Sequence, residues 1–249
     1  MKSLFEPVVV GGLSLRNRTI RSATFEAAFT DTEHFAANLL SSYEALAKNG
    51  IGAIITGMVG IDEHSRVLPS MVKGYGETFI PEMKLLTQSV HALGAKIIVQ
   101  ISHCGQKATH VDGGGSPLGP SDKEIAPGKR ARAMNHEEIR AAVSAFAMTA
   151  VRCKEAGADA VQIHGAHGYL LSQFLNPHFN KRTDEYGGDI RGRSKIVMDV
   201  YDAVRAAVGI DYPVWIKINS KDLTEESIPR MSFCGCAKSW TKEASTQSK

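Results

Sequence analysis

Short apolar runs recur along the chain, and longer amphipathic segments separate them. Most of these runs are rich in Val, Ile and Ala and are flanked by glycine or polar residues. That pattern is typical of strands that are buried on both faces of a sheet. The predicted strands cover residues 17–24, 50–57, 95–102, 160–163 and 212–219.

The amphipathic segments between the strands predict helices, because their apolar residues return every three or four positions. One of these helices has a clear start at Asn135, whose side chain can cap the first turn. Glu137 and Glu138 follow within that turn, where acidic residues favour the helix dipole. The other predicted helices cover residues 38–48, 81–93 and 194–208.

The strict alternation of strand and helix predicts an α/β fold with a parallel sheet and right-handed crossovers. Long repeating units with strands buried on both faces favour a (β/α)8 TIM barrel. Only five such units are found before residue 219, so we expect the chain to hold the first five βα units of a C-terminally truncated barrel. The predicted domains are therefore 1–219, the N-terminal part of the barrel, and 220–249, an atypical polar tail.

One internal segment breaks the alternation. Residues 111–133 contain three consecutive glycines and several prolines, which predicts an irregular excursion or lid over the barrel.

Composition and charge exclude several classes of protein. The chain has 43% hydrophobic and 22% charged residues and a net charge of +3, as soluble globular proteins do, and its basic residues are dispersed. We therefore expect neither nucleic-acid binding nor a membrane span. Four scattered cysteines do not form a disulfide framework, and Cys234 and Cys236 alone do not supply a metal site. The apolar run near the N-terminus is too short for a signal peptide, so we expect a cytoplasmic protein.

The stretch of residues 158–193 carries the clearest chemistry. His164, His167 and Tyr169 follow directly on the fourth predicted strand and are separated by small residues that let the backbone turn tightly. Two imidazoles and a phenol at the carboxyl end of a parallel strand could polarise a carbonyl and deliver a proton. The alternative is a strand end with two exposed histidines and a packing tyrosine.

The segment HGAHGYLLSQFLNPHFNKRTDEYGG resembles the signature of the Old Yellow Enzyme family, the flavin-dependent NAD(P)H oxidoreductases and ene-reductases. It is most similar to the branch with bacterial NADH:flavin oxidoreductases and 2,4-dienoyl-CoA reductases. The likeness extends from about residue 4 to residue 219, and it implies the same FMN-binding TIM barrel.

The resemblance also implies which residues contact FMN. Ala23 and Thr24 match the residues at the flavin edge, and Gly57 matches a position where a side chain would obstruct the ring. Gln100 matches the amide that pairs with the flavin pyrimidine. Lys217 matches the cation that stabilises negative charge on the reduced flavin. His164 completes the set of flavin contacts.

The catalytic roles follow from the same resemblance. His164 and His167 match the pair that hydrogen-bonds the oxygen of an activated carbonyl, and Tyr169 matches the proton donor to the α-carbon. Lys107 matches a lysine at the mouth of the site in some relatives, and Arg193 matches the arginine after the YGG element.

Two functions remain open at this point. The first is an FMN-dependent NAD(P)H oxidoreductase that reduces a small unsaturated carbonyl or a quinone-like acceptor, with homo-oligomerisation left open. The second is a truncated, non-catalytic fragment that binds FMN weakly or not at all, because the family holds the FMN phosphate with loops of the seventh and eighth units. An aldolase or hydrolase lacks support, since no Schiff-base lysine or metal-ligand spacing is found.

Overall fold

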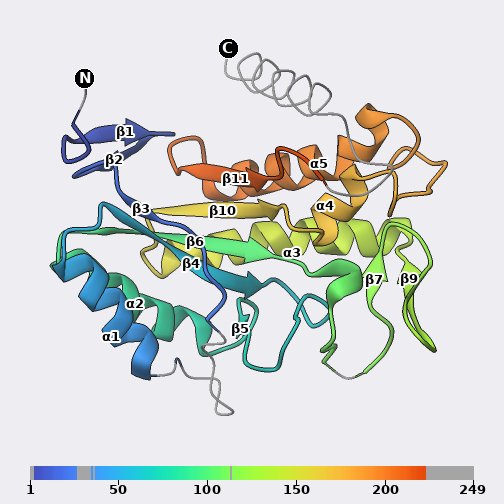
Figure 1. Ribbon diagram of the computed structural model, residues 1–249, viewed down its shortest axis with the longest axis horizontal. Helices are drawn as coiled ribbons and strands as arrows, with labels where there is room; N and C mark the ends of the chain where they lie inside the picture. The colour runs from blue at the N-terminus through green and yellow to red at the C-terminus, as the bar shows by residue number, and fades with distance from the viewer. Residues whose placement is uncertain (1–2, 27–34, 36, 113, 223–249) are drawn as a thin grey trace.

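Five parallel strands form the centre of the molecule (Figure 1). The computed structural model describes residues 3–26, 35, 37–112 and 114–222. Each central strand pairs with the next one along the chain, which confirms the predicted parallel α/β sheet of five units, a half-barrel. The strands are β3 (Ile20–Arg21), β4 (Ala53–Gly60), β6 (Lys96–Ser102), β10 (Ala160–Gly165) and β11 (Val214–Ile218).

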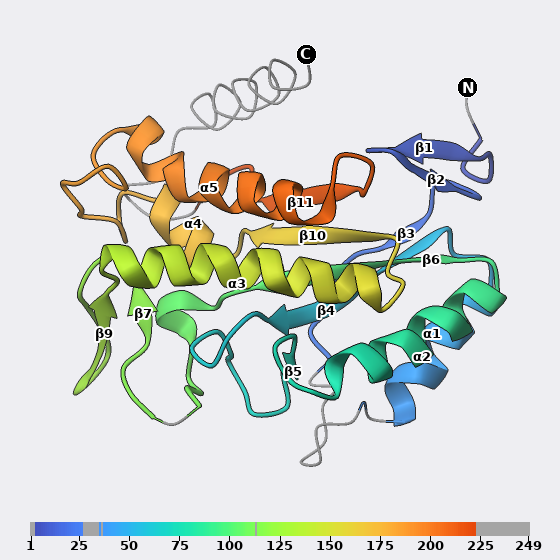
Figure 2. The same ribbon diagram turned by 180° about the vertical axis from the view of Figure 1, so that it is seen from behind.

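Four helices cover the outer face of this sheet, and Figure 2 shows α3 and α5 lying across it. They are α1 (Ala37–Lys48), α2 (Phe79–Ala92), α3 (His136–Glu155) and α5 (Ile190–Val208). The largest apolar cluster lies between sheet and helices, where Ile97, Val161 and Phe146 have no exposed surface. The amphipathic pattern therefore predicted all four helices, although α5 begins at Ile190 rather than at residue 194.

The start of α3 bears out the predicted cap. The Asn135 side chain accepts a hydrogen bond of 2.9 Å from the backbone N–H of Glu138. The Glu138 carboxylate in turn accepts one of 2.8 Å from the backbone N–H of Asn135. Both groups of this capping box satisfy backbone donors that the helix itself leaves unpaired.

A hairpin that the sequence pattern did not predict closes the amino-terminal end of the half-barrel. It consists of β1 (Val8–Val10) and β2 (Leu13–Leu15). Leu13 and Leu15 pack against the inner-face residues Ala53, Ile55, Ile98 and Ala160. The predicted first strand, 17–24, was too long, because only Ile20–Arg21 pairs with β4.

The second predicted strand also had wrong bounds. Residues 50–57 were expected, but β4 covers Ala53–Gly60 and continues past a bulge between Ile55 and Met58. Gly57 therefore lies within the strand and not at its end. A glycine inside a strand often marks a bulge of this kind.

The second part of the segment 111–133 is not irregular, which corrects the prediction for residues 118–133. It contains β7 (Leu118–Gly119), β8 (Lys123–Ala126) and β9 (Lys129–Ala133), which form a small separate sheet. The side chains of β8 and β9 are mostly exposed, so these strands lack the apolar pattern by which buried strands are recognised in a sequence.

The remaining short elements are β5 (Val72–Lys73), the 3-10 turn η1 (Gly105–Lys107) and α4 (Leu170–Leu175). Across the described ranges, no helix is long and apolar enough to span a membrane. Most of the predicted tail, 220–249, lies outside the described residues, as do Cys234 and Cys236. The domain boundary at residue 219 therefore stays a prediction.

Candidate active site

A polar layer lies on the inner face of the sheet, near the carboxyl ends of the strands. Gln100 and Gln162 occupy the same register on neighbouring strands, and Gln100 Nε2 donates a hydrogen bond of 2.7 Å to Gln162 Oε1. Both side chains are buried. Gln162 was not among the predicted site residues, because a single glutamine in an apolar run carries no sequence signal of its own.

Lys217 extends this layer on the edge strand β11, in register with His164. Its ammonium group lies 3.4 Å from the Ser22 hydroxyl, which places the ends of β3 and β11 close together across the half-barrel. Ala23 and Thr24 follow Ser22 along the chain, with Ala23 partly buried and Thr24 exposed. The structure thus brings Ala23, Thr24 and Lys217 to the same end of the sheet as Gln100 and His164, so five of the six predicted flavin contacts lie there.

His164 is held as a neutral imidazole. Its side chain is 2% exposed, and burial lowers its pKa to about 3, with smaller contributions from His167, Lys217 and Lys107. Its Nδ1 accepts a hydrogen bond of 3.3 Å from the backbone N–H of Ala166. A neutral ring that accepts at Nδ1 carries its proton at Nε2, so His164 offers one N–H donor.

His167 has a strained backbone that two other side chains hold. Its φ is +61°, in the left-handed region that non-glycine residues seldom adopt. Lys107 Nζ donates to its carbonyl oxygen at 2.7 Å, and its N–H donates to Asn219 Oδ1 at 3.1 Å. Burial, then Lys217 and Lys107, lower the pKa of His167. Lys107 and Asn219 thus hold the backbone of His167, whose exposed imidazole has a lowered pKa and is neutral at pH 7.

Tyr169 completes a group of three rings. Its centroid lies 5.0 Å from that of His164, and the His164 and His167 centroids lie 5.1 Å apart. Burial raises the pKa of Tyr169, so its phenol keeps its proton at neutral pH. Lys107 Nζ lies 5.4 Å from the centre of the Tyr169 ring. The three residues that the sequence singled out therefore converge at one place.

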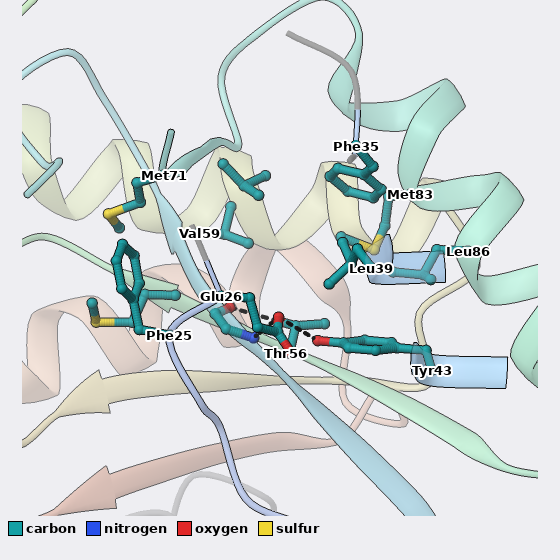
Figure 3. Close-up of a pocket in the computed structure, with 13 residues that line it drawn as sticks. Phe25, Glu26, Phe35, Leu39, Tyr43, Thr56, Val59, Met71, Met83 and Leu86 are labelled. Atoms are coloured by element: carbon teal, nitrogen blue, oxygen red, sulfur yellow. Dashed lines mark hydrogen bonds between the residues drawn. The ribbon is translucent and has the colours of Figure 1, made fainter. Parts of the chain in front are cut away.

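The surroundings of Gly57 differ from the expectation. Figure 3 shows Glu26 reaching across the bulge of β4, where its carboxylate accepts from Tyr43 Oη at 2.8 Å and Gly57 N at 3.3 Å. A Cβ at Gly57 would lie 2.8 Å from the Thr24 carbonyl oxygen. The chain's own backbone is therefore reason enough for glycine here, and a flavin contact at Gly57 stays a prediction. The adjoining apolar cavity holds only about 20 Å³, room for one water.

Two further groups contribute to the structure around the site. Arg193 donates from Nε to the Leu175 carbonyl oxygen at 2.8 Å and ties α5 to the end of α4. His136, Asp184 and Glu185 lie close enough to share an ion, but Asp184 already accepts a bidentate pair from Arg182.

The polar layer has the chemistry that a flavin ring requires. The flavin pyrimidine edge offers both donors and acceptors. The hydrogen bond between the two glutamines uses Gln100 Nε2 and Gln162 Oε1, so Gln100 Oε1 and Gln162 Nε2 take no part in it. Lys217 adds a cation at the neighbouring strand end. The ring half of FMN therefore fits these residues. The described ranges supply five of the barrel's strands and none of its later loops.

The family model for the NADH:flavin oxidoreductase / NADH oxidase family matches residues 3–247. Two curated relatives are a metal reductase of Desulforamulus reducens and an NADPH dehydrogenase of Halalkalibacterium halodurans. The first is 37% identical, with 89% of this chain and 33% of that protein covered. The second is 31% identical, with 96% and 70% covered.

Solved structures give the same result. A 2-naphthoyl-CoA reductase in complex with 2-naphthoyl-CoA matches with a TM-score of 0.89 and 25% identity, over 94% of this chain and 38% of that one. Old Yellow Enzyme from Pichia sp. matches with a TM-score of 0.80 and 30% identity, over 86% and 59%. The chain thus spans between about a third and 70% of the length of these proteins.

Proposed function

Since the chain belongs to the NADH:flavin oxidoreductase / NADH oxidase family, we propose that it forms the catalytic half of an ene-reductase-type site. The resemblance to Old Yellow Enzyme is confirmed, and the family uses FMN as cofactor and a reduced nicotinamide as reductant. The proposed acceptor is an α,β-unsaturated carbonyl compound or a quinone-like molecule. The observation that supports this most is the convergence of His164, His167 and Tyr169.

The two histidines bind the acceptor oxygen. Each is a neutral donor at pH 7, because burial lowers both pKa values. Two N–H groups aimed at one carbonyl oxygen withdraw electron density from the conjugated C=C bond. They also stabilise the negative charge that develops on the oxygen as the β-carbon is reduced.

Tyr169 supplies the proton. Its phenol is protonated at neutral pH and lies beside His164, within reach of a substrate whose oxygen the histidines hold. A proton delivered to the α-carbon completes the reduction of the double bond. Lys107 and Asn219 position this machinery by holding the backbone of His167.

Bound FMN would accept electrons from the nicotinamide and pass them to the acceptor. Gln100, Gln162 and Lys217 are the residues that would hold its ring, and Lys217 would stabilise the negative charge of the reduced ring. Ala23 and Thr24 would lie at its edge.

The test separates the two half-reactions by stopped-flow absorbance, with NADPH as reductant and a small uncharged enone as acceptor. We expect the double variant His164→Ala/His167→Ala to slow flavin reoxidation by the enone at least about 100-fold. Flavin reduction should fall much less. Tyr169→Phe should slow enone turnover and leave quinone reduction nearly intact.

Equal loss in both half-reactions of the histidine variant would contradict the carbonyl-binding role. A wild-type chain that purifies and titrates without any flavin absorbance would instead favour the non-catalytic fragment.

A further inference from the structure

A cleft to which the chemistry above assigns no ligand lies next to the three rings. It has a volume of about 450 Å³ and lies between η1, the β8–β9 hairpin and the segment after α4. Clefts that hold small ligands usually measure roughly 300–1,000 Å³. This one is therefore large enough for a substantial part of a substrate.

The lining of the cleft is strongly basic. The lining residues include three lysines and only one carboxylate, that of Glu124. Lys107 belongs to η1, Lys123 to β8 and Lys129 to β9, so three separate segments bring these charges together. Ile125 and Phe179 add apolar surface. Such a lining favours a ligand with several negative charges over one with a single carboxylate.

One of these lysines is held in place by its neighbours. Lys123 Nζ lies 2.8 Å from His178 Nε2 and 4.3 Å from the centre of the Phe179 ring. An ammonium group fixed in this way loses less conformational entropy when it pairs with an anion. Lys129 has no hydrogen bond or ion pair from its ammonium group among the described residues, so its charge is available.

A buried polar group also lies in the cleft wall. Gln106 is 4% exposed and lines the cleft, and its Nε2 donates to the Ser121 carbonyl oxygen. Its Oε1 is buried and has no hydrogen-bond partner. Buried acceptors without a partner are rare in folded proteins, so this atom points to a donor that is supplied from outside the chain.

The cleft and the three rings share a wall. Lys107 lines the cleft and donates to the carbonyl oxygen of His167. Gln173 also lines the cleft, and its Nε2 donates to the carbonyl oxygen of Gly168 at 2.8 Å. A ligand that reacts beside His167 and Tyr169 can thus extend over this wall into the cleft.

We propose that the cleft around Lys107, Lys123 and Lys129 binds the phosphate-bearing nucleotide tail of a molecule that reacts at the three rings. The proposal rests on the proposed function, because it takes the other end of this molecule to lie at that site. Lysine ammonium groups pair well with phosphate, and the amide oxygen of Gln106 can accept from a hydroxyl or amino group of the nucleotide. Two kinds of reactant carry such a tail: a reduced nicotinamide dinucleotide and a coenzyme A thioester.

The experiment measures binding directly and needs no turnover. Isothermal titration calorimetry follows the binding of ADP, NADPH and coenzyme A to the wild-type chain and to Lys123→Gln/Lys129→Gln, at low and at physiological ionic strength. ADP carries the pyrophosphate that both tails share. Two controls accompany this variant: Lys123→Arg/Lys129→Arg keeps the charge, and Lys84→Gln removes an exposed lysine of α2.

We expect ADP to bind the glutamine variant about tenfold more weakly, with a smaller dependence on salt. The arginine and Lys84 controls should bind it as the wild type does. The reactant that occupies the cleft is the one, NADPH or coenzyme A, whose affinity falls together with that of ADP.

Two results would overturn the proposal. One is equal affinity of all three ligands for the wild type and the glutamine variant, and the other is no binding of any of them to the wild type. Either result leaves the small-enone assay untouched, because an uncharged acceptor without a tail does not reach the lysines. Failure of the cleft and failure of the proposed function are therefore distinguishable.

Discussion

The two faces of the parallel sheet are built from the same strands and differ in almost every other respect. On the outer face, Ile97, Val99, Val161 and Ile163 are fully buried beneath the four helices. On the inner face, the hairpin covers an apolar layer near the amino-terminal ends of the strands. Above that layer the side chains become polar, with Gln100 and Gln162 side by side at one level and His164 at the next level of the same face.

The difference shows how one sheet separates stability from chemistry. Side chains alternate between the two faces of a strand, so each strand can contribute one set of residues to the core and another to the site. The outer face gains its free energy from apolar burial against helices of the same chain. The inner face holds buried polar groups, which cost free energy unless they are paired.

The first prediction disturbs the outer face. Phe146→Ala removes a fully buried ring from α3, and we expect it to lower the free energy of unfolding by about 3–5 kcal/mol in chemical denaturation. Met148→Ala on the same helix should change it by less than about 0.5 kcal/mol, because Met148 is 59% exposed. Similar losses of unfolding free energy in the two variants would contradict the conclusion that the buried face of α3 packs in the core and its exposed face does not.

The second prediction disturbs the polar layer. Gln100→Leu leaves the buried Gln162 carbonyl oxygen without its donor, so we expect a loss of about 1–3 kcal/mol in unfolding free energy. Gln100→Leu/Gln162→Leu should recover part of this loss, because both members of the pair are then apolar. Strictly additive losses in the double variant would show that the two amides do not interact.

The third prediction concerns acid stability. The folded pKa of His164, about 3, lies below the unfolded value of about 6.5, so the unfolded chain binds the proton more readily. Stability from this group is present above pH ~6.5 and is lost as the pH falls toward 3. We expect His164→Asn to make the pH dependence in this window shallower, by at most about 1.4 kcal/mol per pH unit.

Denaturation curves at several pH values measure that slope. A variant at least as acid-sensitive as the wild type would contradict the assignment of a neutral, buried His164.

The fourth prediction concerns the clamp on His167. Lys107→Met removes a positive charge beside the ring, so we expect the pKa of His167 to rise toward its ordinary value. NMR titration of the carbon-bound ring protons of His167 measures this pKa directly and requires no catalytic turnover. Lys107→Arg should retain the lowered value, and Lys84→Met should have no effect. If the pKa of His167 stays the same or falls in Lys107→Met, the charge of Lys107 does not lower the pKa of His167.

Most of the fold could be predicted from periodicity, because the outer face and its helices repeat a strong apolar pattern. Residues 95–102 and the cap at Asn135 illustrate this, since local sequence decides both. The strands β8 and β9 were not predicted, because their side chains are mostly polar and exposed. The pairing of these two strands therefore produces no hydrophobic pattern in the sequence.

The residues of the site also fall into those that the sequence predicts and those that it does not. His164, His167 and Tyr169 could be found because they lie within six consecutive residues. Gln162 and Asn219 could not, because their roles arise only when β6, β10 and the end of β11 come together. Glu26 was missed for the same reason: its partners lie on α1 and at the bulge of β4.

If the polar inner face holds the flavin ring, substitutions there weaken FMN binding, which a titration followed by flavin fluorescence measures. We compare the wild type with Gln100→Leu/Lys217→Met and with Met148→Ala, an outer-surface control. We expect the double variant to bind FMN at least about tenfold more weakly, while the control binds it as the wild type does. Equal FMN affinity in all three proteins would contradict this expectation.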